Sequence, residues 1–470
     1  MNGSRSGVIV CCTMSQTPWG DASELRERML HPGPGHSPEL VARNQRERLL
    51  AATVVAIAAN GYEKTPVAEL LKLSGISRTT FYQHFPGGKE ECFLAAVDAA
   101  AATADEAVER ACAASQRWED GIADGLGALA QEVIDQPAAA RLCLIDVYSA
   151  GAEGLAHAEQ ATAQFGRLLS EALGRSPEHA ATPPAIVSGL VAGIRKVLET
   201  RVAAGDLDEL PGLMPGLADW VVSYRNPPVP VRRPRTRPPV EGATRFVVHD
   251  QVERIFGAIA DTVVEKGYPA MTLDDIVKGA SASLTTFYQH FDGKEEAFLA
   301  AYDTATAQAT AAAMPPFRWS RSWPLAVRAA LEAYLSFLAA EPAWARIATI
   351  DILAAGPAGF EHRDRSLELF DEILEPGLQQ AGDAAPLMVE AIGGAVQGLV
   401  REQIRRRGAE HLLQILPVAT FVALSPFVGP EEAIAVANRG ALRTRGSAQG
   451  RMGGEAPARR APRRRGGHTG

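Results

Sequence analysis

A seven-residue segment, TTFYQHF, occurs twice in this chain, at residues 79–85 and again at residues 285–291. A serine, Ser77 or Ser283, precedes each copy by two positions, and a Lys-Glu-Glu run follows each copy within a few residues. Identity over seven positions that lie about two hundred residues apart does not arise from composition alone. The chain therefore contains one structural unit twice, and its fold must accommodate both copies.

The duplicated unit extends well beyond this segment. RLCLID at 141–146 parallels RIATID at 346–351, and the segment 201–213 parallels the segment 405–416. A repeat that is about two hundred residues long and occurs twice indicates duplicated domains rather than a solenoid of short repeats.

Composition favours an all-α fold. Alanine is abundant, aromatic residues make up only 6% of the chain, and the apolar residues recur with helical spacing. The net charge of −8 excludes a surface that is basic all over, so any nucleic-acid-binding surface must be local. The five cysteines show no paired ligand spacing, which indicates reduced thiols rather than a metal site. No apolar run reaches membrane-spanning length, so we expect a cytoplasmic protein with no membrane partner.

Each copy of the segment lies in a set of short helices. In the first unit, a helix begins near residue 41 and ends at Gly61, a usual C-terminal cap. Thr65 is expected to cap a second helix with its hydroxyl group, Gly75 ends that helix, and Ser77 opens a third. Short helices joined by a tight glycine turn are typical of a helix-turn-helix.

The second unit repeats this pattern in register. Gly267 ends its first helix, Thr272 opens the second with Asp275 as a capping-box partner, and Ser283 opens the third. Ser281 replaces the turn glycine of the first unit, a change of modest cost.

This arrangement resembles the TetR family of bacterial transcriptional regulators. The resemblance rests on Ser-x-Thr-Thr-Phe-Tyr-x-x-Phe followed by Lys-Glu, and it covers roughly residues 43–224 and 247–430. It implies a three-helix DNA-binding domain, a larger helical domain that binds a small-molecule effector, and a dimer with two reading heads. Leu71 and Val277 depart from the family pattern, which usually has alanine there. Two such units in one chain imply either an intramolecular pseudo-dimer or a homodimer of tandem chains.

Seven segments are expected in chain order. They are a disordered extension at 1–40, a helix-turn-helix DNA-binding domain at 41–98, a helical regulatory domain at 99–224, a Pro/Arg-rich linker at 225–246, a second DNA-binding domain at 247–304, a second regulatory domain at 305–438 and a disordered basic tail at 439–470. Proline density makes the linker an extended spacer with a reach of about 50 Å. Its arginines are compatible with an arm on DNA or with a solubilising linker.

The third helix of each unit carries residues suited to DNA. Short polar side chains at the start of a recognition helix reach base edges, and flanking donors contact phosphates. In the first unit the predicted DNA-binding residues are Thr65, Ser77, Arg78, Thr79, Thr80, Tyr82, His84 and Lys89. In the second unit they are Thr272, Ser283, Leu284, Thr285, Thr286, Tyr288, His290 and Lys294. Thr65 and Thr272 are included because the amides of a helix start can face a phosphate.

One chemical difference separates the two reading helices. Arg78 can bind guanine through two hydrogen bonds, whereas Leu284 offers only apolar contact, for instance to a thymine methyl group. We therefore expect two non-identical half-sites in a double-stranded DNA operator.

The sequence thus predicts a DNA-binding transcriptional regulator, in particular an effector-responsive repressor. The alternative is a ligand-binding or protein-interaction protein whose helix-turn-helix domains no longer bind DNA. An enzyme is the least favoured class: Glu153 and His157 lie one helical turn apart, but we find no counterpart of His157 and no set of metal ligands. No catalytic residue, metal site or cofactor is expected, and no effector-contacting residue is assigned.

Overall fold

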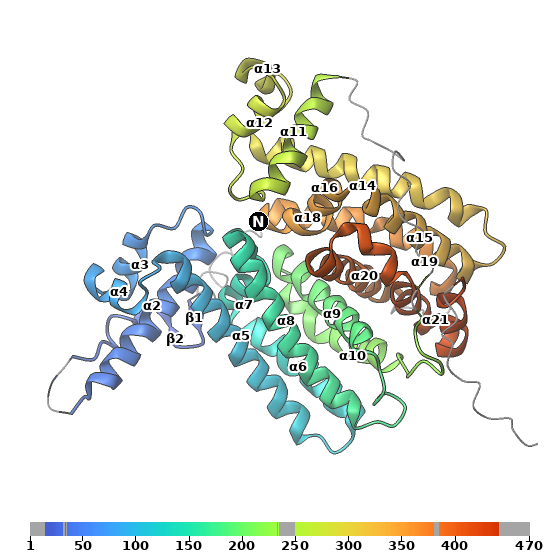
Figure 1. Cartoon of the computed structure of the whole chain (residues 1–470). Helices are drawn as coiled ribbons and strands as arrows, with labels where there is room; N and C mark the ends of the chain where they lie inside the picture. Colours follow the sequence, from blue (N-terminus) through green and yellow to red (C-terminus); the bar gives the residue numbers. More distant parts are fainter. Residues whose placement is uncertain are drawn as a thin grey trace, which may run out of the picture.

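The computed structural model describes residues 15–31, 33, 35–232, 234, 250–379 and 385–440. Apart from one short hairpin, the regular structure in these ranges is helical, which confirms the all-α prediction. Two helical units lie side by side, the first coloured blue to green and the second yellow-green to red (Figure 1).

The elements follow the duplication. The first unit contains β1 (Gln16–Thr17), β2 (Gly20–Asp21), η1 (Ala22–Glu24), α2 (Pro38–Asn60), α3 (Val67–Ser74), α4 (Arg78–His84), α5 (Lys89–Ala114), α6 (Trp118–Asp135), α7 (Pro137–Leu144), η2 (Asp146–Ala150), α8 (Gly151–Gly174), α9 (Pro184–Ala204), η3 (Leu207–Glu209) and α10 (Leu210–Val222). The second contains α11 (Gln251–Lys266), α12 (Leu273–Gly279), α13 (Leu284–Tyr288), α14 (Lys294–Arg318), α15 (Trp323–Ala340), α16 (Pro342–Arg346), η4 (Ile347–Asp351), α17 (Ile352–Ala354), α18 (Gly356–Ser366), α19 (Glu368–Leu378), α20 (Ala385–Arg407), η6 (Ala409–Ile415) and α21 (Leu416–Ala437).

Residues 15–31 are ordered, so the expectation of disorder through residue 40 was wrong for them. The strands β1 and β2 pair antiparallel, and Leu25 is buried against Ala51 of α2. Ser37 accepts a hydrogen bond from the backbone N–H of Leu40 and so caps α2 before the expected start near residue 41. Sequence periodicity missed this segment because its few apolar residues follow no helical or strand spacing. Residues 1–14 lie outside the described ranges.

Each reading head packs three short helices around phenylalanines of the repeated segment. Phe81 and Phe85 of the first head are fully buried, and Phe287 and Phe291 occupy the same positions in the second. Burial of one such side chain contributes about 1.5–3 kcal/mol. The repeated segment therefore supplies the core of each head, which leaves its polar residues for the surface.

The turn before each recognition helix requires a left-handed residue. Gly75 has a φ of 67°, and Ser281 takes a φ of 50° at the matching position. Among the described residues Ser281 is the only non-glycine with a positive φ. The second head therefore keeps the turn geometry, at a cost of about 1–2 kcal/mol for a residue with a Cβ atom.

The two units pair through their C-terminal helices. Helix α9 of the first unit packs along α20 of the second, with α10 and α21 beside them (Figure 1). Small residues permit the approach: a Cβ atom on Gly193 would lie 2.5 Å from the carbonyl oxygen of Ala391. The hydroxyl group of Tyr224 donates to the carbonyl oxygen of Val422 at 2.8 Å. The chain thus forms an intramolecular pseudo-dimer.

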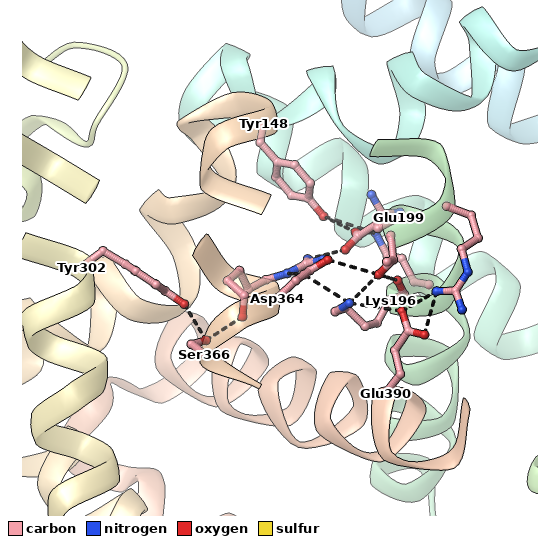
Figure 2. A network of polar contacts seen from close by, with 11 residues as sticks. Tyr148, Lys196, Glu199, Tyr302, Asp364, Ser366 and Glu390 are labelled. Atoms are coloured by element: carbon pink, nitrogen blue, oxygen red, sulfur yellow. Dashed lines mark hydrogen bonds and ion pairs between the residues drawn. The ribbon is translucent and has the colours of Figure 1, made fainter. Parts of the chain in front are cut away.

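A buried set of ion pairs crosses this interface (Figure 2). We call it the interface network; its members are Lys196, Glu199 and Arg201 of α9, Arg363 and Asp364 of α18, and Glu390 of α20. The Lys196 ammonium group lies 3.2 Å from Asp364 and 3.3 Å from Glu390, and Arg201 lies 2.7 Å from Glu390. Charges of the two units therefore neutralise one another inside the interface.

One segment meets the length and composition of a membrane span. The stretch Ala409–Ala437 has a mean hydropathy of 1.8 in its most apolar window, which corrects the expectation that no run reaches this length. However, 56% of that window is buried within the chain, and Gly429 breaks the helix with a φ of 77°. Helix α21 packs on α15 and α20 as a core helix does, and a core helix passes the same test.

The start of the linker is held against the second unit. The Arg232 backbone N–H donates to the side-chain oxygen of Asn438 at 2.7 Å, and the Asn438 amide donates to the Pro230 carbonyl oxygen at 3.1 Å. The extended spacer was therefore a wrong prediction for these residues. The other linker arginines and the tail beyond residue 440 lie outside the described ranges.

Candidate nucleic-acid interface

Both recognition helices begin with the same cap. The Ser77 hydroxyl oxygen accepts from the backbone N–H of Thr80 at 3.1 Å, and Ser283 does the same with Thr286 at 3.0 Å. The hydroxyl groups of each pair also lie 2.8 Å apart. The predicted residues Ser77, Thr80, Ser283 and Thr286 thus fix the start of their helices.

Beyond the caps, each helix presents an exposed face. In the first head, Arg78, Thr79 and Tyr82 are exposed, and Arg78 forms no salt bridge with any described residue. In the second, Leu284, Thr285 and Tyr288 are exposed at the matching positions. These residues form one continuous polar and apolar strip on each head.

The two tyrosines stand on the core with their rings outward. Tyr82 is 44% exposed and Tyr288 56% exposed. Each ring meets the neighbouring buried phenylalanine edge-on, at 5.2 Å from Phe81 and 5.7 Å from Phe287. DNA contact requires this exposure, since a buried hydroxyl group cannot reach a phosphate.

The two histidines differ in their surroundings. His84 is half-buried, and its Nε2 atom lies 3.1 Å from the side-chain oxygen of Gln45. Burial, with a smaller effect of Arg46, lowers the pKa of His84, so the ring is neutral and its Nε2–H is used by Gln45. His290 is exposed. Only His290 is placed as a free donor.

The lysines at the start of α5 and α14 face inward. The Lys89 ammonium group donates to the Tyr62 carbonyl oxygen at 2.9 Å and lies 4.1 Å from the centre of the Tyr62 ring. Lys294 donates to the carbonyl oxygen of Met271 at 3.0 Å and lies 4.5 Å from the Tyr268 ring centre, and burial lowers the pKa of Lys294. The structure therefore corrects their predicted phosphate role: both hold a loop of the head against the long helix.

Thr65 and Thr272, predicted as equivalent, are not. Thr65 is fully buried and donates to the Gly61 carbonyl oxygen at 2.8 Å, so it neither caps α3 nor reaches DNA. Thr272 is exposed and forms a capping box with Asp275. Hydrogen bonds from Lys266 and Thr272 hold the pKa of Asp275 well below its usual range, so an ionised carboxylate lies at this helix start. That charge opposes phosphate binding there, which corrects both assignments.

The sequence analysis missed an anchor between the second head and its body. The Asp351 carboxylate accepts from the backbone N–H of Tyr268 at 2.8 Å, and Arg346 donates to the Val264 carbonyl oxygen at 3.2 Å. In the first unit, the matching Arg141 and Asp146 pair with each other at 3.3 Å and have no hydrogen bond to the described residues of their head. The repeated Arg and Asp were visible in the sequence as a signal.

His157 does have a counterpart, contrary to the sequence analysis. Its Nδ1 atom lies 2.7 Å from Asp98, and the Nδ1 atom of His362 lies 2.8 Å from Asp303 in the second unit. Each pair ties the helix after the central turn, α8 or α18, to the long helix that carries the head. No group of three or more potential metal ligands occurs among the described residues.

The body of the first unit contains a cavity of 130 Å³ between α5, α6, α7, α8 and α9. Its walls are mainly alanine, valine and leucine, with Asp105, Glu132, Gln136 and Arg195 as polar groups. The cavity lies along α5, whose first residues hold the first head.

Two helix-turn-helix heads with exposed recognition helices define the class of protein as a DNA-binding transcriptional regulator. The profile of the family described as "Bacterial regulatory proteins, tetR family" matches residues 49–96 and 255–301, which lie in the two heads. The chain belongs to the TetR family and carries two tandem units of it. The HTH-type transcriptional regulator LmrA of Bacillus subtilis (strain 168) is 36% identical over 55 residues, which make up 12% of this chain and 29% of that relative. The match thus spans less than a third of the relative.

Solved structures of regulators are also similar to parts of the chain. The fatty acid degradation regulator FadR from Bacillus halodurans matches with a TM-score of 0.35 and 17% identity, over 39% of this chain and 97% of that chain. FadR from Bacillus subtilis in complex with stearoyl-CoA gives a TM-score of 0.32 and 16% identity, over 37% and 97%. The TetR family regulator PfmR from Thermus thermophilus gives 0.30 and 23%, over 37% and 98%.

Proposed function

We propose that the chain is an effector-responsive repressor that binds one bipartite DNA operator as a single polypeptide. The observation that carries this proposal is the pair of exposed recognition faces on one intramolecular pseudo-dimer. A homodimeric regulator needs two chains to present two heads, whereas this fold presents both on one chain.

The exposed residues assign different roles to the two heads. Arg78 is exposed and without a salt-bridge partner among the described residues, so its guanidinium group is available to the N7 and O6 atoms of guanine. Leu284 at the matching position can contact only an apolar base edge such as the thymine methyl group. Tyr82, Tyr288 and His290 supply phosphate contacts, which fix register rather than sequence.

The cavity of the first unit supplies the effector response. Val97 and Asp105 of α5 line it, and Lys89 at the start of the same helix holds the Tyr62 loop of the head. A ligand that favours a different position of α5 therefore favours a different position of the first head. If that position does not match the spacing of the half-sites, operator affinity falls.

Selection of DNA fragments by the purified full chain tests the proposal. We expect two unlike half-sites and an affinity that falls linearly with the logarithm of salt concentration. Arg78→Ala should weaken binding by about 1–3 kcal/mol and relax one base position in one half-site. Arg117→Ala, on an exposed loop of the body, is the matched control and should leave binding unchanged. Binding without sequence preference, or an Arg78→Ala variant equal to the control, would favour a protein-interaction role instead.

A further inference from the structure

The bodies of the two units can be compared residue by residue. From Lys89 to Thr162 the first unit aligns with Lys294 to Leu367 of the second without a gap. The structure supports this register at close contacts: a Cβ atom on Gly154 would lie 1.9 Å from a carbonyl oxygen of η2, and one on Gly359 would lie 2.1 Å from the matching oxygen. The His–Asp pairs described above also match in this register.

In the first unit, the cavity exists because its wall residues are small. Val97 and Leu129 lie on α5 and α6, and Ala139 and Ala158 lie on α7 and α8. None of these side chains fills the space between the helices, which leaves the 130 Å³ open.

In the second unit, large side chains occupy the same four positions. They are Tyr302 for Val97, Tyr334 for Leu129, Trp344 for Ala139 and Arg363 for Ala158. Tyr302 is fully buried and its hydroxyl group lies 2.8 Å from that of Ser366 (Figure 2). Trp344 is also buried. Since protein interiors are close-packed, these side chains take the volume that the first unit leaves open.

The polar groups of the first cavity are acceptors. Asp105 and Glu132 form no salt bridge with any described residue, and the buried Gln136 side-chain oxygen has no hydrogen-bond partner among them. The one cation in the wall, Arg195, is neutralised by Glu199 at 2.8 Å. Burial raises the pKa of Asp105 to about 6 and also raises the pKa of Glu132, a cost that a nearby positive charge would offset.

The second unit lacks these carboxylates as well. Thr310 stands at the position of Asp105, and Phe337 stands at the position of Glu132. Acidic side chains and open space therefore occur together in one unit and are both absent from the matching positions of the other.

We propose that the first unit alone takes the effector, that one molecule binds per chain, and that this ligand is a compact apolar cation. The second unit acts as a permanently filled partner, whose own aromatic side chains stand where a ligand would. The inference rests on the proposed effector response, but binding itself is measured without DNA.

Isothermal titration of the full chain with three probes tests the ligand class. The probes are benzyltrimethylammonium, its uncharged carbon analogue neopentylbenzene, and phenylacetate. We expect one benzyltrimethylammonium per chain, bound at least tenfold more tightly than phenylacetate. Asp105→Asn with Glu132→Gln should weaken the cation at least tenfold and change neopentylbenzene binding less than twofold. Asp120→Asn, an exposed carboxylate outside the cavity, is the control. Phenylacetate binding as tightly as the cation would overturn the ligand class.

Exchange of residues between the units tests the stoichiometry. Val97→Tyr with Leu129→Tyr should abolish binding in the first unit. Tyr302→Val with Tyr334→Leu should open a second site that takes neopentylbenzene but not the cation. Two cations bound to the unchanged chain would overturn the inference, and melting curves show whether each variant is folded. Cation binding that leaves operator affinity unchanged would refute the effector response alone, whereas operator release by an anionic probe would refute this inference alone.

Discussion

The interface network gives the sharpest stability prediction. Glu199 of the first unit is 2% exposed and is paired with Arg195 of its own helix and with Arg363 of the second unit. Burial by itself opposes ionisation, but Arg363 and Arg195 outweigh it and lower the pKa of Glu199. Glu199→Ala leaves two guanidinium groups buried without their carboxylate, which costs about 3–5 kcal/mol.

Urea denaturation of the full chain at neutral pH measures this loss. The double variant Glu199→Ala/Arg363→Met should be less destabilised than the sum of the single variants, with a coupling of about 0.5–3 kcal/mol, because the uncompensated Arg363 is gone. Arg365→Met on the same α18 is the matched control: its partner Glu361 lies 3.8 Å away and both are exposed, so we expect a change within about 1 kcal/mol.

The pH dependence provides a second readout of the same pair. Because the folded-state pKa of Glu199 lies below its ordinary value of 4.5, its contribution is complete above that pH and is lost as the pH falls through the lower value. A loss below about 1 kcal/mol for Glu199→Ala, or strictly additive single variants, would refute the claim that this pair joins the two units.

Four further predictions follow from single sites. Leu284→Arg should shift selected operators toward a symmetric palindrome, and unchanged selection would contradict the assignment of the two half-sites. Ser281→Gly should stabilise the second head by about 1 kcal/mol, seen as a higher unfolding midpoint, since glycine adopts the positive φ without strain. Thr65→Val should lower stability by about 1–3 kcal/mol and leave the salt dependence of DNA binding unchanged, because its hydroxyl group is buried. Stability should fall as the pH rises from 3.8 to about 6 through ionisation of Asp105, and Asp105→Asn should remove this component of a pH-dependent unfolding series.

The sequence predicted the heads well because their chemistry is local. The repeated segment combines core phenylalanines with exposed polar residues at helical spacing, so both copies form the same three-helix unit. The caps Ser77, Ser283 and Thr272 were also predictable, since a cap depends on residues three positions away.

The errors arose where a partner lies far along the chain. Lys89 reads as a free cation, but the carbonyl group that it binds belongs to Tyr62, and no spacing rule shows that. Thr65 and Thr272 have the same sequence context, yet only the folded head shows that Thr65 turns inward. The interface network joins residues of different units, so periodicity within one unit cannot reveal it.

The filled second cavity is an intermediate case. Its residues were in the sequence, but their meaning depends on a register that the His157 and His362 pairs establish only in three dimensions.

The central claim is that one chain presents two reading heads to one operator. The most direct measurement is the mass of the smallest specific complex between the full chain and its selected duplex, obtained by native mass spectrometry and sedimentation. The account predicts one chain per duplex, with both half-sites protected from cleavage. Two chains per duplex with one protected half-site from each would contradict it.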